Sequence, residues 1–116
     1  MNVVRGGRIA LTFDDGPNPD ADTTIRLPDI LRRGGNVKAT IFLIGAFVDA
    51  QPDLAREISA QGHAIGNHTF THPNLTGIGP AAVVDELQSG ERAIDRALGK
   101  HRVTGSPFRA PYLRQV

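Results

Sequence analysis

The chain has 116 residues, of which 40% are hydrophobic and 22% charged, the make-up of a single soluble globular domain. Lys and Arg number 13 against 12 Asp and Glu, so a net charge of +1 gives no electrostatic reason to expect nucleic acid or an anionic membrane as partner. The absence of cysteine excludes disulfides and thiolate metal sites, so any metal site must use nitrogen and oxygen ligands.

The first half of the chain predicts two strands separated by a helix. Residues 8–13 form a short apolar run that ends in Asp-Asp-Gly-Pro, a sharp turn. A helix is predicted over residues 23–33, and Pro28 indicates that it starts near that residue. Residues 37–44 are almost continuously apolar, as expected of a strand covered on both faces, and Gly45 ends it.

The second half continues the alternation. A helix is predicted over residues 53–61, a short strand over 64–67 and a polar loop over 68–79. The strongest helical pattern covers residues 80–98, and a fourth extended segment runs from 103 to 108. The apolar residues of that helix fall mostly on one face: Val83, Val84, Leu87, Ile94 and Leu98.

Alternating strands and helices predict an α/β fold with a parallel sheet and right-handed crossovers. We find no linker or repeat, so residues 1–116 are expected to form one domain. No apolar run approaches the roughly 20 residues that a membrane span needs. Location follows from processing: secreted or associated with the cell envelope if a leader was removed, and cytoplasmic otherwise.

Polar clusters follow three of the predicted strands, and ligands gather at the carboxyl ends of parallel strands. His68 and His72 are four residues apart, a spacing that places both imidazoles on one side of a helical turn and allows them to share an ion. The alternative is two surface histidines in a polar loop. His63 and His101 lack such a partner, and we expect a helix-end and a solvated loop residue, respectively.

Asp14 and Asp15 follow the first strand. Two adjacent carboxylates often form an exposed turn. In a functional site, one would bind the metal and the other would act as general base toward water, and a His/His/Asp set suits Zn²⁺. After the fourth segment, Arg109 can orient a catalytic Asp, and the backbone amide of Tyr112 can face an oxyanion. The alternative is a strand end with a surface Arg and an aromatic plug.

Together the clusters resemble the polysaccharide deacetylases, carbohydrate esterase family 4 with the NodB homology domain. The sequences T-F-D-D-G-P, H-T-F-T-H-P and R-A-P-Y begin at Thr12, His68 and Arg109 and are similar to the family's first three motifs, in the same order. No nucleophile elbow or phosphate loop supports an unrelated hydrolase or phosphatase instead.

The resemblance implies a distorted (β/α) barrel and metal-dependent hydrolysis of N- or O-acetyl groups on a chitin-, peptidoglycan- or xylan-type polysaccharide. The implied metal is most simply Zn²⁺. The implied catalytic residues are Asp14 as base, Arg109 to orient it and Tyr112 to offer its amide to the oxyanion. The implied metal ligands are Asp15, His68 and His72.

Two later motifs of the family, one of them a Leu-x-His that carries the general acid, have no counterpart before Val116. Loss of a general acid costs about 10²–10⁴-fold in rate. We therefore expect a barrel that is incomplete at the C-terminus, either a fragment or a short protein completed by self-association through an open sheet edge. The alternative function is a catalytically impaired module that binds metal and glycan.

Overall fold

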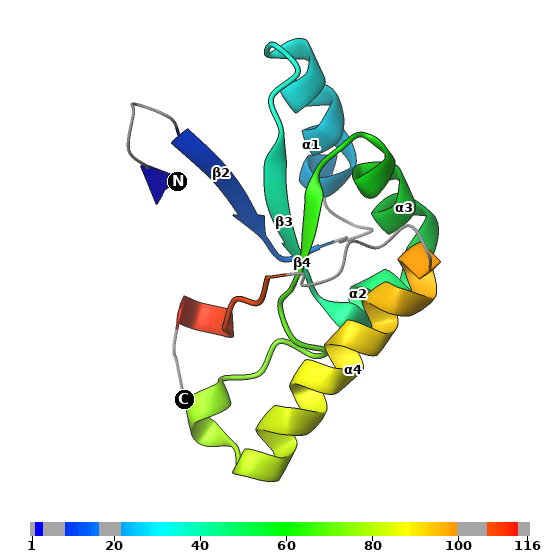
Figure 1. The fold of residues 1–116 in the computed structure, drawn as a ribbon. Coiled ribbons are helices and arrows are strands. Elements are labelled where there is room, and N and C mark those ends of the chain that lie inside the picture. Colours follow the sequence, from blue (N-terminus) through cyan, green and yellow to red (C-terminus); the bar gives the residue numbers. More distant parts are fainter. Residues whose placement is uncertain (1, 4–8, 17–21, 100–106, 114–116) are drawn as a thin grey trace.

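Three parallel strands form the centre of the sheet. The computed structural model describes residues 2–3, 9–16, 22–99 and 107–113. The strands β2 (Ile9–Asp14), β3 (Ala39–Leu43) and β4 (Ala64–Asn67) lie side by side and parallel, so their carboxyl ends meet at one edge (Figure 1). A two-residue strand, β1 (Asn2–Val3), pairs antiparallel with β2 on its outer side.

The helices cover one face of this sheet (Figure 1). They are α1 (Asp22–Arg33), α2 (Gly45–Ala50), α3 (Pro52–Ala60) and α4 (Pro80–Leu98). Two short 3-10 turns, η2 (Leu75–Gly77) and η4 (Pro111–Leu113), lie in the segments that follow β4 and Phe108. None of the helices in the described part of the chain is both long and apolar enough to cross a bilayer.

The core lies between the strands and the helices. Successive residues of a strand point to opposite faces, so alternate positions such as Ile41 and Leu43 meet the helices. The buried cluster consists of Ile41, Leu43, Val48, Ala55, Ile58, Ile65, Ile94, Ala97 and Leu98. The intervening residue, Phe42, faces the other side of the sheet, where Arg109 stacks on it.

The predicted α/β fold with parallel strands is confirmed, whereas closure into a barrel stays a prediction. Helix α2 was not predicted from the sequence, because Gly45 was interpreted only as the end of a strand. A Cβ on Gly45 would lie 2.7 Å from Phe70 Cδ1 and 3.0 Å from Gly90 Cα, so this glycine lets α2 pack closely against α4. The residue is needed for packing and begins the helix.

The prediction that α1 starts near Pro28 is wrong, because the helix begins at Asp22 and runs through the proline. An internal proline costs a helix about 3 kcal/mol. Leu27 and Leu31 lie on the same helix face and are half-buried and buried. Burying a leucine is worth about 1.5–3 kcal/mol, so the pair offsets the cost.

The predicted bounds of α4 are confirmed, and its apolar residues do lie mostly on the packed face: of those named, only Val84 is exposed, at 50%. In the predicted extended segment, residues 103–106 lie outside the described residues, as does His101. Its last residue, Phe108, forms a parallel bridge with Asn67 at the end of β4. This bridge brings the 107–113 segment to the edge where the three strands end.

Candidate metal centre

Asp15, His68 and His72 converge at the carboxyl ends of the strands. Asp15 Oδ1 lies 3.3 Å from His68 Nε2 and 3.1 Å from His72 Nε2, and one ligand atom from each residue lies within 4.8 Å of the others. The exposed fractions are 61% for Asp15, 22% for His72 and 2% for His68, so the cluster opens to solvent on the aspartate side. Two nitrogens and one oxygen form a donor set that fits Zn²⁺ with open positions.

His68 is positioned by hydrogen bonds at both its backbone and its ring. Its backbone N–H donates to Leu43 O at 3.0 Å, which places the residue beside the end of β3. The ring Nδ1 lies 2.8 Å from the carbonyl oxygen of Arg109. A carbonyl can only accept, so Nδ1 carries a proton, and Nε2 is the ring atom that faces Asp15 and is available to a metal. The tautomer is the one that a metal bound through Nε2 requires.

Left-handed backbone is concentrated at this site. Of the five non-glycine residues with positive φ in the described chain, Asp15 (70°), Thr69 (71°), His72 (64°) and Tyr112 (58°) belong to it. Each such residue costs of order 1–3 kcal/mol, so the surrounding structure must hold it in place. The expectation that the two histidines share a helical turn is wrong: a loop with left-handed backbone at Thr69 and His72 brings the rings together.

The hydroxyl of Thr69 closes this loop. It donates to His68 O and accepts a hydrogen bond from the backbone N–H of His72 at 3.1 Å. These two bonds join the histidines that a helix would have joined through its own backbone. The threonine directly after the first histidine, in the order H-T-x-x-H, could therefore have indicated a residue that closes the loop.

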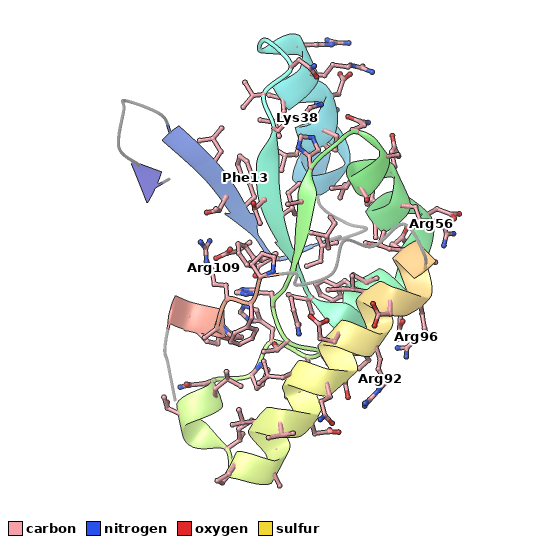
Figure 2. The ribbon with its side chains drawn as sticks, in the orientation of Figure 1. Phe13, Lys38, Arg56, Arg92, Arg96 and Arg109 are labelled. Carbon is pink, nitrogen blue, oxygen red and sulfur yellow. The ribbon has the colours of Figure 1, made fainter. Side chains whose placement is uncertain are left out.

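Asp14 and Arg109 form a pair next to the cluster of Asp15, His68 and His72. Arg109 Nη1 donates to Asp14 Oδ1 and to Thr12 Oγ1, both at 2.9 Å. Its guanidinium carbon lies 4.3 Å from the ring centroid of Phe42, a cation–π contact that fixes the plane of the side chain. Figure 2 shows Arg109 below the end of β2, where Asp14 lies.

Tyr112 borders the cluster on its solvent side. The ring is 62% exposed, and its edge meets the ring of His72 with the centroids 4.8 Å apart. The residue is the central one of η4, in left-handed conformation. The structure thus brings all six candidate residues to one edge of the sheet, and leaves His63 at the other.

Two supporting residues were missed by the sequence analysis. Asn67 is buried, and its amide donates to Leu87 O and accepts from Thr69 N, both at 2.9 Å. Glu86 accepts hydrogen bonds from the backbone of the same loop. No local pattern points to Glu86, because its partners, Phe70 and Thr71, lie 16 and 15 residues away in sequence.

The fold and the cluster together define an α/β protein with a candidate hydrolytic metal site at the carboxyl ends of its strands. The family model described as polysaccharide deacetylase matches residues 2–115. The chain belongs to this family, which confirms the resemblance drawn from the three motifs.

Characterised relatives agree with this assignment. A chitooligosaccharide deacetylase from a Bradyrhizobium species is 44% identical over 114 residues, which cover 94% of this chain and 48% of the relative. A peptidoglycan-N-acetylglucosamine deacetylase from Bacillus cereus is 40% identical over 91 residues, covering 78% of this chain and 32% of that protein. The solved family 4 carbohydrate esterase from Streptomyces lividans, in complex with acetate, gives a TM-score of 0.81 at 35% identity, covering 96% and 54% of the two chains. The chain thus spans about half the length of these relatives or less.

Proposed function

We propose that this chain carries the metal centre and the catalytic base of a deacetylase that hydrolyses N- or O-acetyl groups on a polysaccharide. One observation carries the proposal: the Asp15, His68 and His72 cluster lies beside the Asp14–Arg109 pair at one edge of the sheet. The names of the two curated relatives support glycans that contain N-acetylglucosamine as the first substrates to test.

Asp15, His68 and His72 would hold the metal, and nitrogen and oxygen donors of this kind favour Zn²⁺. A divalent ion there supplies Lewis-acid chemistry, which polarises a carbonyl and makes water more acidic. The chain contributes the ligand geometry. The carbonyl of Arg109 fixes the His68 tautomer, and the left-handed backbone of His72 turns its ring toward Asp15.

Asp14 is the proposed general base. Arg109 bonds its Oδ1, and no residue in the described part of the chain bonds Oδ2, which is therefore free to accept a proton from the attacking water. A positioned base of this kind contributes about 10²–10⁴-fold in rate. The bond to Arg109 holds the carboxylate in one orientation, so the proton is always taken by the same oxygen.

Tyr112 completes the proposed site. Its backbone amide is offered to the oxyanion that develops when water adds to the acetyl carbon, and its exposed ring lies where a sugar would approach. The acetyl C–N or C–O bond then breaks. Acetate is released, and the nitrogen or oxygen left on the sugar takes up a proton, which balances the one removed from water and gives the free amine or hydroxyl.

The test combines zinc content with acetate release. The purified chain and its His68→Ala/His72→Ala variant are dialysed against Zn²⁺, the bound metal is measured, and both are incubated with an acetylated chito-oligosaccharide. We expect one zinc per chain and acetate release in the first protein, and neither in the variant. A chain that binds no zinc would contradict the proposal.

A second candidate is a module that binds metal and glycan without turnover. The family resemblance implies a general acid on a Leu-x-His segment, and these 116 residues by themselves contain none, so the two candidates are separated by measuring turnover. Stoichiometric zinc lost in the double variant, together with glycan binding but no acetate release, would support this candidate over the enzyme.

A further inference from the structure

The two histidines of the cluster are supported very differently. His68 is buried, and its ring Nδ1 is bonded to the carbonyl of Arg109. His72 is half-buried, and within the described chain its Nδ1 has no hydrogen-bond partner. Its ring lies against the rings of His68 and Tyr112, and its Nε2 lies beside the carboxylate of Asp15. The direction of the His72 ring is therefore set by the backbone of the loop before it.

That loop lies between two helices, and each helix satisfies one kind of backbone group. The carbonyls of Thr69 and Phe70 accept hydrogen bonds from the N–H groups of Gly45 and Ala46, both at 2.9 Å. These donors belong to the first turn of α2, where no intrahelical acceptor exists. The carbonyl side of the loop is thus held by the start of α2, and its N–H side needs an acceptor from elsewhere.

Glu86 of α4 supplies that acceptor. Its Oε1 receives the backbone N–H of Phe70 at 3.0 Å and that of Thr71 at 2.8 Å, while Oε2 receives the hydroxyl of Thr71 at 2.8 Å. Bonds to an ionised carboxylate are about twice as strong as those between neutral groups. Asn67 fixes the start of the loop through the neighbouring carbonyl of Leu87.

We propose that Glu86 is a positioning residue for the metal centre: it holds the Phe70–Thr71 backbone so that His72, the next residue, points its Nε2 at the site. This inference rests on the proposed metal-binding function. Glu86 touches neither the ligand atoms nor the substrate side of the cluster, and it acts only through the loop. Removing it leaves all three proposed ligand residues in the chain but loosens the backbone that directs the His72 ring, whose Nδ1 has no hydrogen-bond partner in the described chain.

The experiment compares zinc affinity in the wild-type chain with that in Glu86→Ala, using competition with a chromophoric chelator. We expect affinity to fall about 10–100-fold, as for other groups that orient ligands. The Co²⁺-loaded variant is expected to show an altered visible spectrum, which reports ligand geometry. In the metal-free protein, amide exchange of Phe70 and Thr71 is expected to accelerate. A role in stability alone would leave the cobalt spectrum unchanged.

Matched variants separate position from charge. Asp85→Ala removes the same charge from the neighbouring, exposed residue of α4 and is expected to leave zinc affinity and the cobalt spectrum unchanged. Glu86→Gln keeps an oxygen for the two backbone N–H groups and turns its NH₂ to the Thr71 hydroxyl, so it should restore most of the affinity. Should Glu86→Ala not fold, Glu86→Asp keeps the charge but shortens the reach, and is expected to show the same loss.

The outcomes distinguish this inference from the proposed function. Zinc binding by the wild type that is unchanged in Glu86→Ala, or in Glu86→Asp if that replaces it, would overturn the positioning role and leave the metal centre standing. An equal loss in Asp85→Ala would also overturn it, since charge and not position would be responsible. A wild-type chain that binds no zinc would overturn both.

Discussion

Two buried histidines lie at opposite ends of β4 and bond to backbone groups of opposite kinds. At the amino end, His63 Nδ1 accepts a hydrogen bond from the N–H of Ala39 at 3.1 Å. At the carboxyl end, His68 Nδ1 donates to the carbonyl of Arg109. His63 Nδ1 is therefore unprotonated, whereas His68 Nδ1 carries a proton and its Nε2 faces Asp15.

Burial alone does not distinguish a structural histidine such as His63 from a proposed ligand such as His68, because both side chains are buried. The backbone partner does. A strand that offers an N–H locks the ring as an acceptor and leaves only a donor on its other side. A segment that offers a C=O frees the lone pair for a metal. At the carboxyl end of the sheet the histidine Nε2 is thus available to the proposed metal, whereas at the amino end the histidine serves as a hydrogen-bond acceptor for the backbone.

The largest expected effect comes from Asp14→Asn at the carboxyl end. Under the proposed function, asparagine cannot accept the proton from water, so acetate release should fall about 10²–10⁴-fold. Zinc content should not change, since Asp14 lies outside the ligand set. The kcat of acetate release from a chito-oligosaccharide, measured at constant zinc occupancy, checks this. An unchanged rate would remove Asp14 from the role of base.

The next effect sets the two histidines directly against each other. His68→Ala should weaken zinc binding by more than about 100-fold, since loss of a ligand exceeds the cost of losing a supporting residue. His63→Ala should leave zinc affinity intact but lower the free energy of unfolding by about 1–3 kcal/mol, because the N–H of Ala39 loses its buried acceptor. Chelator competition gives the zinc affinity of both variants, and urea unfolding gives their stability. Equal zinc affinities would contradict the distinction between the two histidines.

A smaller effect is expected at Gly90, which lies in α4 next to the loop of residues 68–72. A Cβ there would lie 2.3 Å from Asn67 Oδ1, so Gly90→Ala should cost about 1–3 kcal/mol of unfolding free energy through overpacking. Gly77→Ala is the matched control, because nothing lies within 4 Å of its added carbon. Urea unfolding that treats the two variants alike would show that the approach of Asn67 to α4 is not tight.

The smallest effect is a pH dependence at the amino end. Burial, and then the charge of Lys38, lower the pKa of His63 below its ordinary 6.5. The unfolded chain therefore binds this proton at higher pH than the folded chain does, and stability from neutral His63 is present above pH 6.5 and is lost as the pH falls below it. His63→Asn keeps an acceptor without titrating. Urea unfolding of the metal-free proteins should show a smaller loss of stability for the variant between pH 7.5 and 5.5.

Much of the fold could be predicted because local pattern and tertiary role agree. The period of the apolar residues places α4, helix start and stop residues place α3 to within a residue, and the bounds predicted for β4 also hold. Alternation of strands and helices gives parallel pairing. Parallel strands end at a common edge, so the candidate residues after β2 and β4 were expected to meet. Where local and tertiary signals disagree, as at Gly45 and Pro28, the sequence alone predicted the wrong boundary.

The support of the site could not be predicted from local pattern. The left-handed backbone of Thr69 is contrary to the preference of a β-branched residue, and it persists because Asn67, Glu86 and the start of α2 hold its neighbours. Those contacts come from segments that meet only in the folded chain. The sequence thus predicted which side chains would meet at the candidate site but not which residues hold them there.

Arg109 joins functions that are otherwise separate. Its side chain bonds Asp14 and Thr12, its carbonyl sets the ring of His68, and its N–H donates to Asn67 O at 3.0 Å. One residue therefore connects the proposed base, a proposed ligand and the start of the loop of residues 68–72. Displacing the segment that carries Arg109 would therefore disturb the proposed base, the proposed ligand and the start of the loop together.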